Sequence, residues 1–329
     1  MTIAKPLCGD EPQLEENLRS FAQQDYPNYE IVFGVRDADD PAAAIAKQFG
    51  EVVVAPDAIG TNLKVSSLAA MRPKMRGEII VISDSDMRVT AEYLTAVVAP
   101  FENEGVGAVT CLYRAVVTPS VSEGPGRRGG ATNLDRRLWS ALSASGINEN
   151  FHPSALVANA LQPIRFCFGA TMAIRANILD EIGGFESLAN QLADDYMLGK
   201  LVSDHGYRVV LSDYVVDTIV REPSFRALFD HELRWARTIR SVRPWSYAST
   251  ILTMPLIWSL FLGWPAIALA FALRIALQAV APGPFAPWLI PPRDILTFFV
   301  YATAHLGRSV RWRNKEFEVS PGGALRANA

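Results

Sequence analysis

Two aspartates, Asp84 and Asp86, stand two positions apart directly after a β-branched run at residues 79–82. Such a run predicts a buried strand, and residues i and i+2 of an extended chain point the same way, so both carboxylates are expected to reach one ligand. Ligands of open α/β sheets bind outside the carboxyl ends of the strands. A divalent cation, Mg²⁺ or Mn²⁺, that carries a diphosphate fits this position, because it takes one or two carboxylates and completes its shell with phosphate and water. The alternative is a solvated turn, since Asp and Ser are good turn formers.

A second acidic segment follows an earlier predicted strand, at residues 36–40. Asp37 is the binding candidate here, because a carboxylate at this edge of the sheet can hold the uracil or ribose of a nucleoside. Asp40 precedes Pro41, and this pair predicts the N-cap and first turn of a helix instead.

Two further polar segments each precede a predicted helix. Lys64 follows Asn62 and could meet a base or a phosphate, although a loop lysine is often simply solvated. Asp194 and Asp195 open another helix. A general base needs a carboxylate within hydrogen-bond reach of the acceptor hydroxyl, and one of two adjacent acids can face a cleft while the other caps or braces the helix.

A basic amphipathic helix is predicted at residues 225–242, and it carries His231, Arg234 and Trp235. Arg234 could neutralise a departing diphosphate, and the Trp235 ring could stack on a sugar or acceptor. The alternative is a basic helix that rests on anionic lipid, and both can hold on different faces.

The elements that position these residues alternate between strand and helix. Strands are expected at 3–7, 29–35, 52–55, 78–83, 166–174 and 208–211, and helices at 12–24, 41–49, 134–161, 176–182 and 196–206. This rhythm predicts a mainly parallel α/β sheet with flanking helices. No Gly-x-Gly-x-x-Gly or Walker loop follows the first strand, which argues against dinucleotide and P-loop folds. Residues 118–133 are rich in Gly, Pro and Ser and predict a mobile loop, a candidate lid.

Composition sets the class of protein. The chain has 329 residues, half of them hydrophobic, and a net charge of −3, so it can bury a large core and shows no bulk attraction to nucleic acid. Its three cysteines are widely separated, and they predict neither a zinc site nor a disulfide framework, in agreement with a reducing cytoplasmic domain.

Residues 251–273 contain no charged side chain, and the apolar character continues to residue 281 with only Arg274 interrupting. This length suffices for a membrane-spanning segment, which we expect at 246–281, with an interfacial or short membrane segment and a basic tail at 282–329. A buried helical hairpin of a soluble protein is the alternative, which Pro255, Gly263 and Pro265 leave open, although prolines are also tolerated in membrane helices. Basic clusters at 234–243 and 308–315 predict that both lie on the cytoplasmic face, and no signal peptide is expected before the first strand.

The order of these motifs resembles the family 2/21-like glycosyltransferases, in their processive and ceramide glucosyltransferase-like branches. The family pattern is D, DxD, (E/D)D and (Q/R)xxRW before an apolar tail. It is matched here by Asp37, Asp84-Ser85-Asp86, Asp194-Asp195-Tyr196 and His231-x-x-Arg234-Trp235. Shorter matches at residues 5–12, 24–27, 168–171, 183–185 and 311–313 extend the likeness over nearly the whole chain. It is most similar to glycosyltransferases associated with bacterial hopanoid biosynthesis.

This resemblance implies a GT-A fold over residues 1–245, a UDP-sugar donor, a divalent metal and a membrane lipid acceptor, with the enzyme on the cytoplasmic side of a bacterial inner membrane. Asp37 and Lys64 would bind the donor, Asp84 and Asp86 its diphosphate and the metal, and Asp195 would be the base. His231, Arg234 and Trp235 would serve the leaving group and the acceptor. We expect an inverting transfer of a sugar, N-acetylglucosamine in the first instance, to a hopanoid polyol such as bacteriohopanetetrol, with ceramide glucosylation as the alternative.

His231 stands where the family has Gln or Arg, which makes its diphosphate contact sensitive to pH. Relatives tend to begin with a membrane helix, whereas the first strand is expected here at residue 3.

Two other functions fit parts of the pattern. Haloacid-dehalogenase phosphatases also place Asp-x-Asp after a hydrophobic strand, but Arg88 and the late position of the motif argue against them. A membrane-tethered UDP-sugar-binding subunit without turnover is the non-enzyme alternative, against which the intact acids argue.

Overall fold

The computed structural model describes residues 1–9, 11–118, 133–312, 315–320 and 322–327. The chain forms two compact units: residues 1–113 with 155–218, and residues 114–154 with 219–329. The predicted loop at 118–133 falls almost wholly outside the described residues.

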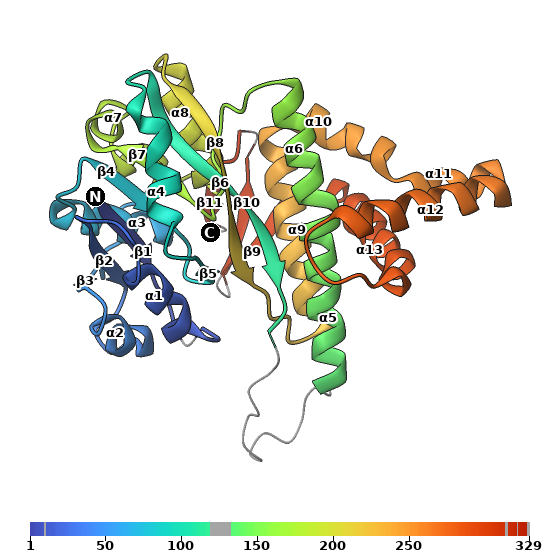
Figure 1. The fold of residues 1–329 in the computed structure, drawn as a ribbon, viewed down its shortest axis with the longest axis horizontal. Helices are drawn as coiled ribbons and strands as arrows, with labels where there is room; N and C mark the ends of the chain where they lie inside the picture. The colour runs from blue at the N-terminus through green and yellow to red at the C-terminus, as the bar shows by residue number, and fades with distance from the viewer. Residues whose placement is uncertain (10, 119–132, 313–314, 321, 328–329) are drawn as a thin grey trace. The chain divides into compact units, whose positions relative to one another are not determined.

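The first unit holds an eight-stranded sheet in the order β3-β2-β1-β4-β7-β6-β8-β5 (Figure 1). Strands β1 to β4 pair in parallel, whereas β7 is antiparallel to both β4 and β6, and β5 is antiparallel to β8. The strands are β1 (Thr2–Pro6), β2 (Glu30–Val35), β3 (Glu51–Val54), β4 (Ile79–Ile82), β5 (Met87–Arg88), β6 (Val106–Val116), β7 (Met172–Arg175) and β8 (Arg208–Ile219).

Helices cover both faces of this sheet, because successive side chains of each central strand point to opposite faces. On β4, Val81 belongs to one apolar core while Ile80 and Ile82 belong to the other. The first core is completed by α1 (Leu14–Ala22), α2 (Pro41–Ala46) and α4 (Tyr93–Val98). The second is completed by α3 (Leu63–Met71), α7 (Ala176–Glu181) and α8 (Asp194–Asp204). Short 3₁₀ turns lie at Arg72–Lys74, Ala99–Glu102 and Phe185–Leu188.

Most of the predicted elements are confirmed, and the differences concern one strand start, one strand end and several unpredicted elements. The strand expected at 166–174 begins only at Met172, because residues 168–171 form a turn closed by a bridge between Phe168 and Thr171. The strand expected at 208–211 continues to Ile219. Strands β5 and β6 and helix α4 were not predicted.

The second unit is mainly helical and has its own core, which includes Leu142, Leu228, Leu296 and Val300. Helix α5 (Asn133–Ser145) continues through a π-helical turn (Gly146–Phe151) into α6 (His152–Leu161), whose last residues belong to the first unit. Then come α9 (Phe225–Val242), α10 (Pro244–Ser249), α11 (Pro255–Leu262), α12 (Trp264–Val280) and α13 (Ile290–His305), with 3₁₀ turns at Thr250–Thr253 and Pro287–Leu289. A small antiparallel sheet of β9 (Ser309–Trp312), β10 (Lys315–Val319) and β11 (Leu325–Ala327) follows.

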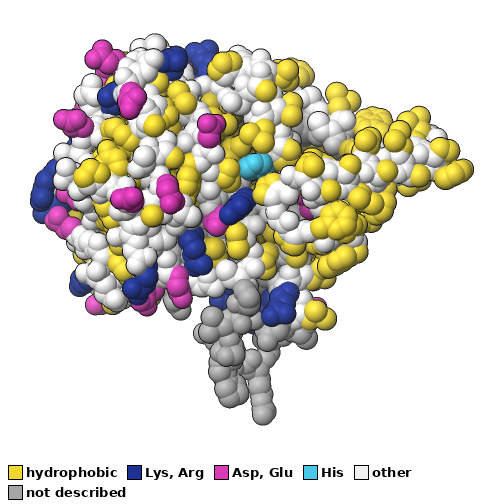
Figure 2. Space-filling model, viewed as in Figure 1, with side chains coloured by type: hydrophobic (Ala, Val, Ile, Leu, Met, Phe, Trp, Pro, Cys, Tyr) yellow, Lys and Arg dark blue, Asp and Glu magenta, His cyan; other side chains and the backbone are white. Residues whose placement is uncertain are grey.

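The predicted apolar segment folds as a helical hairpin, not as one straight helix. Gly263 adopts a φ of 86° between α11 and α12, a conformation that favours glycine. Within the described part of the chain, no single helix has both the length and the apolar character to cross a bilayer, while Pro244–Thr253 and Pro255–Leu262, bent by 52°, pass that test together. Apolar side chains cover the outside of α11 and α12 (Figure 2), and Phe261, Leu262 and Trp264 are 74–80% exposed. Arg274, the charge inside the apolar run, is buried and pairs with Asp294.

Candidate functional site

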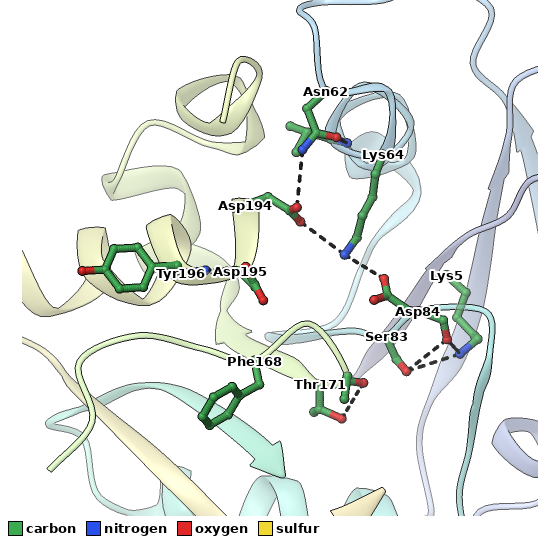
Figure 3. A network of polar contacts seen from close by, with 12 residues as sticks. Lys5, Asn62, Lys64, Ser83, Asp84, Phe168, Thr171, Asp194, Asp195 and Tyr196 are labelled. Atoms are coloured by element: carbon green, nitrogen blue, oxygen red, sulfur yellow. Dashed lines mark hydrogen bonds and ion pairs between the residues drawn. The ribbon is translucent and has the colours of Figure 1, made fainter. Parts of the chain in front are cut away.

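The starts of α3 and α8 meet at the carboxyl end of β4 through one lysine. Lys64 Nζ lies 2.7 Å from Asp84 Oδ1 and 3.2 Å from Asp194 Oδ2, so α3 and α8 are joined at the carboxyl end of β4 (Figure 3). Burial opposes the charged form of Lys64, but Asp194 and Asp84 outweigh it and raise the pKa of the ammonium above its usual value. Lys64 therefore lies beside the predicted site residue Asp84, and a side chain that is only 13% exposed does not fit the alternative of a solvated loop lysine.

Asn62 fixes the position of Lys64. Its side-chain oxygen accepts a hydrogen bond from Val65 N and caps α3, while its amide donates to Gln191 O at 2.8 Å and to Asp194 Oδ1 at 3.4 Å. The side chain is fully buried. One amide therefore ties the start of α3 to the start of α8.

Asp195 and Asp84 face the same small space. A Cβ placed on Gly169 would lie 3.3 Å from Asp84 Oδ2 and 3.4 Å from Asp195 Oδ2, so both carboxylates border this glycine. Asp195 Oδ1 accepts a hydrogen bond from Tyr196 N at 2.7 Å. Neither Asp194 nor Asp195 caps α8, whose N-cap is Ala193. Burial, reinforced by the neighbouring Asp194 carboxylate, raises the pKa of Asp195 to about 6.

Asp86 lies in the turn that follows Asp84, between β4 and β5, where its side chain accepts a hydrogen bond from Thr218 Oγ1 at 3.3 Å. Burial, then the charges of Asp84 and Glu11, raise the pKa of Asp86 to about 7. The charges of Asp84 and Glu11 oppose ionisation of Asp86 more than Lys5 favours it, so a bound cation would stabilise the ionised form.

Lys5 holds the turn from the other side. It is fully buried on β1, where Nζ donates to Asp84 O at 2.7 Å and lies 3.5 Å from the centre of the Phe21 ring. Burial lowers the pKa of Lys5 to about 7, against the attraction of Asp84 and Asp86. Asn17 on α1 also supports the turn, donating to Ser85 O at 3.2 Å.

Lys5, Asn17 and Gly169 were not predicted as site residues. Lys5 gives the clearest sequence signal, since it is a charged residue within a strand that is otherwise apolar. Asn17 and Gly169 show their roles only when the chain is folded.

Asp37 lies on an exposed turn after β2, where its side chain accepts a hydrogen bond from Asp39 N at 3.0 Å. Asp40 caps α2 by accepting from Ala42 N, which confirms that prediction, and it also accepts from Gly9 N. Asp37 is thus available at the sheet edge, while Asp40 is occupied by the backbone.

The last three predicted residues belong to the second unit, on α9. His231 Nδ1 lies 2.9 Å from Glu222 Oε1, a buried carboxylate, and its ring centre lies 4.2 Å from that of Trp235. Arg234 and Trp235 are partly buried on the same helix. Glu222 was not predicted and fixes the His231 ring.

No group of three or more His, Cys, Asp or Glu side chains in the part of the chain described here converges as a complete metal cage. Mg²⁺ and Mn²⁺ are commonly held by one or two carboxylates with phosphate and water, so Asp84 and Asp86 suffice in number and type. A cation held there would also offset the charges of Asp84 and Glu11, which raise the pKa of Asp86.

Comparison with solved structures identifies the fold. Mannosyltransferase PcManGT from Pyrobaculum calidifontis, solved with GDP-Man and Mn²⁺, superposes with a TM-score of 0.51 and 22% identity, over 92% of this chain and 81% of its own. The likeness shows a GT-A-like α/β fold with a mixed, mostly parallel sheet and flanking helices, as predicted.

Sequence relatives narrow the class. Ceramide glucosyltransferases 3 and 1 of Caenorhabditis elegans are each 21% identical, over 99% and 100% of this chain and 74% and 73% of their own lengths. Ceramide glucosyltransferase of Komagataella phaffii is 32% identical over 29% of this chain and 21% of its own. The family model described as "Glycosyl transferase family 21" matches residues 1–124 and 130–325. The chain therefore belongs to glycosyl transferase family 21 and is a glycosyltransferase.

Proposed function

We propose that this glycosyltransferase moves a sugar from a UDP-sugar to the hydroxyl group of a membrane lipid, with inversion at the anomeric carbon. The observation that carries the proposal is the shared position of Asp84 Oδ2 and Asp195 Oδ2 beside Gly169. One carboxylate can then serve the diphosphate side of the donor while the other faces the attacking hydroxyl.

Asp195 is the general base of this scheme. It takes the proton of the lipid hydroxyl as the oxygen bonds to the anomeric carbon, and the bond from that carbon to the β-phosphate oxygen breaks, so that UDP leaves with the electron pair. A pKa of about 6 leaves Asp195 mostly ionised at neutral pH while keeping it a stronger base than an ordinary aspartate. The donor already carries its leaving group, so a second catalytic carboxylate is unnecessary.

Asp84 and Asp86 are the residues that would hold Mg²⁺ or Mn²⁺. A bound divalent ion would neutralise charge on the diphosphate. Lys64 orients Asp84 by pairing with Oδ1, which turns Oδ2 toward Gly169. Lys5 fixes the backbone of the same turn.

The remaining roles rest on the motif order of the family. Asp37 would hold the nucleoside, and its exposed place after β2 fits that role. His231, Arg234 and Trp235 would serve the leaving group and the acceptor. Glu222 accepts from His231 Nδ1 and leaves Nε2 of the ring to act on a ligand.

For the acceptor we propose a lipid with a primary hydroxyl at the membrane surface, and for the donor UDP-N-acetylglucosamine. The likeness of the short motifs to those of hopanoid-associated glycosyltransferases favours a hopanoid polyol such as bacteriohopanetetrol. The names of the sequence relatives favour ceramide, with glucose as the sugar, as the second candidate.

We further propose that residues 246–281 enter the bilayer and that residues 282–329 form an interfacial segment and basic tail, with the catalytic domain at 1–245 on the cytoplasmic side of a bacterial inner membrane. The exposed apolar surface of α11 and α12 supports the first part. Arginines at both ends of the apolar segment support the orientation.

The test is lipid analysis by mass spectrometry after expression in membranes that contain both bacteriohopanetetrol and ceramide, with each UDP-sugar supplied in turn. A hexosaminyl hopanoid that is absent with Asp195→Asn supports the main proposal. A glucosylated ceramide would support ceramide glucosylation, the second candidate function. The absence of any glycolipid would contradict the proposal that the acceptor is a lipid.

A further inference from the structure

Helices α11 and α12 lie side by side and project from the other helices of the second unit (Figure 1). Around their tip the apolar side chains are not confined to one stripe. Leu260, Phe261 and Leu262 are 66–80% exposed, although successive residues of a helix point about 100° apart, so no single protein face could cover all three. A helix that is apolar on all sides requires apolar surroundings, and the surroundings proposed above are lipid.

The position of Arg274 limits the length of the apolar tip. Residues 264–273 of α12 carry no charge, and at 1.5 Å per residue they extend for about 15 Å. Helix α11, with eight residues, extends for about 12 Å. The hydrocarbon core of a bilayer is about 30 Å thick, so one leaflet supplies about 15 Å. The uncharged part of the hairpin therefore matches one leaflet in length.

At the base of the hairpin the surroundings of α12 change from apolar to ionic. Arg274 is only 6% exposed, and it donates from Nη2 to Asp294 Oδ1 at 2.9 Å and from Nη1 to Asn150 Oδ1 at 3.1 Å. One turn further on, Gln278 Nε2 donates to Glu149 Oε1 at 2.9 Å. We call these five residues the ionic base. Because its members come from α12, α13 and the π-helical turn, this level of α12 is packed against protein.

The chain leaves the hairpin at the level of the ionic base. After α12 it forms an irregular segment at residues 281–286, and Ala286 N donates to Gln278 Oε1 at 2.9 Å. Irregular backbone that faces lipid is unfavourable inside the hydrocarbon core, because its N–H and C=O groups lack partners there. We therefore expect residues 281–286 at the membrane surface, on the side from which the hairpin enters.

The polar side chains of α11 are satisfied by the chain itself. Ser259 Oγ donates to Leu256 O at 2.7 Å, and Trp258 Nε1 donates to Ile251 O at 2.8 Å. On the other side of the turn, Pro265 has no N–H group that would require a partner. Apolar surroundings would therefore leave no side-chain donor of α11 without an acceptor.

We propose that the hairpin of α11 and α12 enters only one leaflet of the bilayer, with Gly263 near the bilayer centre, and that the ionic base sets this depth. The inference rests on the proposed entry of residues 246–281 into the bilayer and adds where that entry stops. The lipids in contact with the hairpin are then those of the leaflet from which it enters.

The experiment measures the depth of fluorescent labels in vesicles that contain nitroxide lipids, with the quenching group either at the membrane surface or at the bilayer centre. One label is attached to Leu262→Cys at the tip and another to Leu273→Cys beside Arg274. A membrane-impermeant reductant that destroys the label is added outside the vesicles or trapped inside them. It reports the side from which each label can be reached.

Both variants are made in the full-length chain with Cys8→Ser, because the other two cysteines, Cys111 and Cys167, are buried. The control label is attached to Leu161→Cys. Leu161 is a leucine of α6 in the first unit and is 83% exposed, so it resembles the tip in side chain and exposure but lies outside the hairpin.

The label at Leu262 is expected about 10–15 Å deeper than the label at Leu273, because that is the length of the uncharged helix between them. It should be quenched mainly from the bilayer centre and reached by the reductant from neither side. The label at Leu273 should be quenched from the membrane surface, and the label at Leu161 should not be quenched.

The possible failures are distinguishable. A tip label that is quenched at the surface and reached by reductant trapped inside would show that the hairpin crosses both leaflets, which overturns this inference while membrane entry stands. Equal depths for the labels at Leu262 and Leu273 would exclude the ionic base as the limit of insertion. If both labels were unquenched and reached from outside, the entry of residues 246–281 would be contradicted as well. Sugar transfer by the same protein is assayed separately and can stand in each case.

Discussion

Asp195, the proposed general base, lies in an unusual environment. It borders the same space as Asp84, and burial together with Asp194 raises its pKa to about 6. Both properties depend on the fold. Of the two consecutive acids at the start of α8, Asp194 pairs with Lys64, whereas Asp195 borders Gly169. The acidity of Asp195 and the space between its carboxylate and that of Asp84 can therefore be tested separately.

The first prediction concerns the pH dependence of kcat/KM. The base must be ionised to accept the hydroxyl proton, so kcat/KM is expected to fall about ten-fold per pH unit as the pH drops below about 6. The raised pKa of Asp195 affects folding stability in the opposite direction, because activity increases with pH whereas stability decreases. Because the folded state binds the Asp195 proton more tightly than the unfolded state, whose pKa is about 4, this group makes the protein less stable as pH rises from about 4 to about 6. A pH–rate profile measured over the range where the fold is intact checks the first statement, and a flat profile down to pH 5 would contradict it.

The second concerns Gly169. Gly169→Ala places a methyl group 3.3 Å from Asp84 Oδ2 and 3.4 Å from Asp195 Oδ2, close enough to displace either carboxylate. A shift of a few tenths of an ångström in either carboxylate is expected to lower kcat about ten-fold. The midpoint of thermal unfolding should change little, since the methyl points toward side-chain oxygens and not toward backbone. Full activity in Gly169→Ala would show that the space between the two carboxylates is not where the reaction occurs.

Among the secondary-structure elements, the N-termini of α3 and α8 are linked by hydrogen bonds from one side chain. Asn62 caps α3 and also holds Gln191 and Asp194, and it is fully buried. Asn62→Ala is expected to cost about 2 kcal/mol or more of unfolding free energy, because the cap is lost and a buried carbonyl loses its donor.

Ser224→Ala is the matched control for Asn62→Ala. Ser224 caps α9 through Ala227 N, in the second unit, and its loss should cost about 1 kcal/mol. Asn62→Ala should also reduce turnover, whereas Ser224→Ala should act on stability. Equal losses of stability, measured by chemical denaturation, would contradict the linking role of Asn62.

Sequence reasoning predicts elements where the signal is local. The β-branched run of β4, the Asp40–Pro41 start of α2 and the amphipathic pattern of α9 each identify their element. Strand β6 escapes prediction because its sequence mixes Gly, Thr and Cys with valines, and its burial depends on strands far away in the chain. The acids of the site are visible as motifs, whereas Lys5 and Gly169 acquire their roles through contacts across more than seventy residues.

At the scale of the whole molecule, the apolar segment shows the same limit. Its composition predicts contact with a membrane, and Gly263 with the neighbouring prolines allows a hairpin, but the backbone conformation that Gly263 adopts is known only from the structure. The hairpin of α11 and α12 exposes apolar side chains, and fully burying one such side chain is worth about 1.5–3 kcal/mol.

The hairpin proposal predicts that changing Phe261, Leu262 and Trp264 together to Ser releases the protein from membranes. Membrane partition, measured by sedimentation after a high-salt wash, is expected to fall more than ten-fold. The control is a triple change to Ser at Leu156, Val157 and Leu161, exposed apolar residues of α6 in the first unit. Retention of the hairpin variant in the membrane pellet, or equal release of the control, would count against insertion.

The central claim is that Asp195 is the base of a sugar transfer, and the most direct measurement compares Asp195→Asn with the unchanged enzyme in two assays, UDP-sugar binding and lipid-dependent release of UDP. Asp204→Asn, an exposed acid on the same helix, is the control. The account predicts that Asp195→Asn binds the donor with little change and is no less stable at neutral pH, while UDP release falls at least a hundred-fold. Turnover by Asp195→Asn within a few-fold of the unchanged enzyme would contradict the claim.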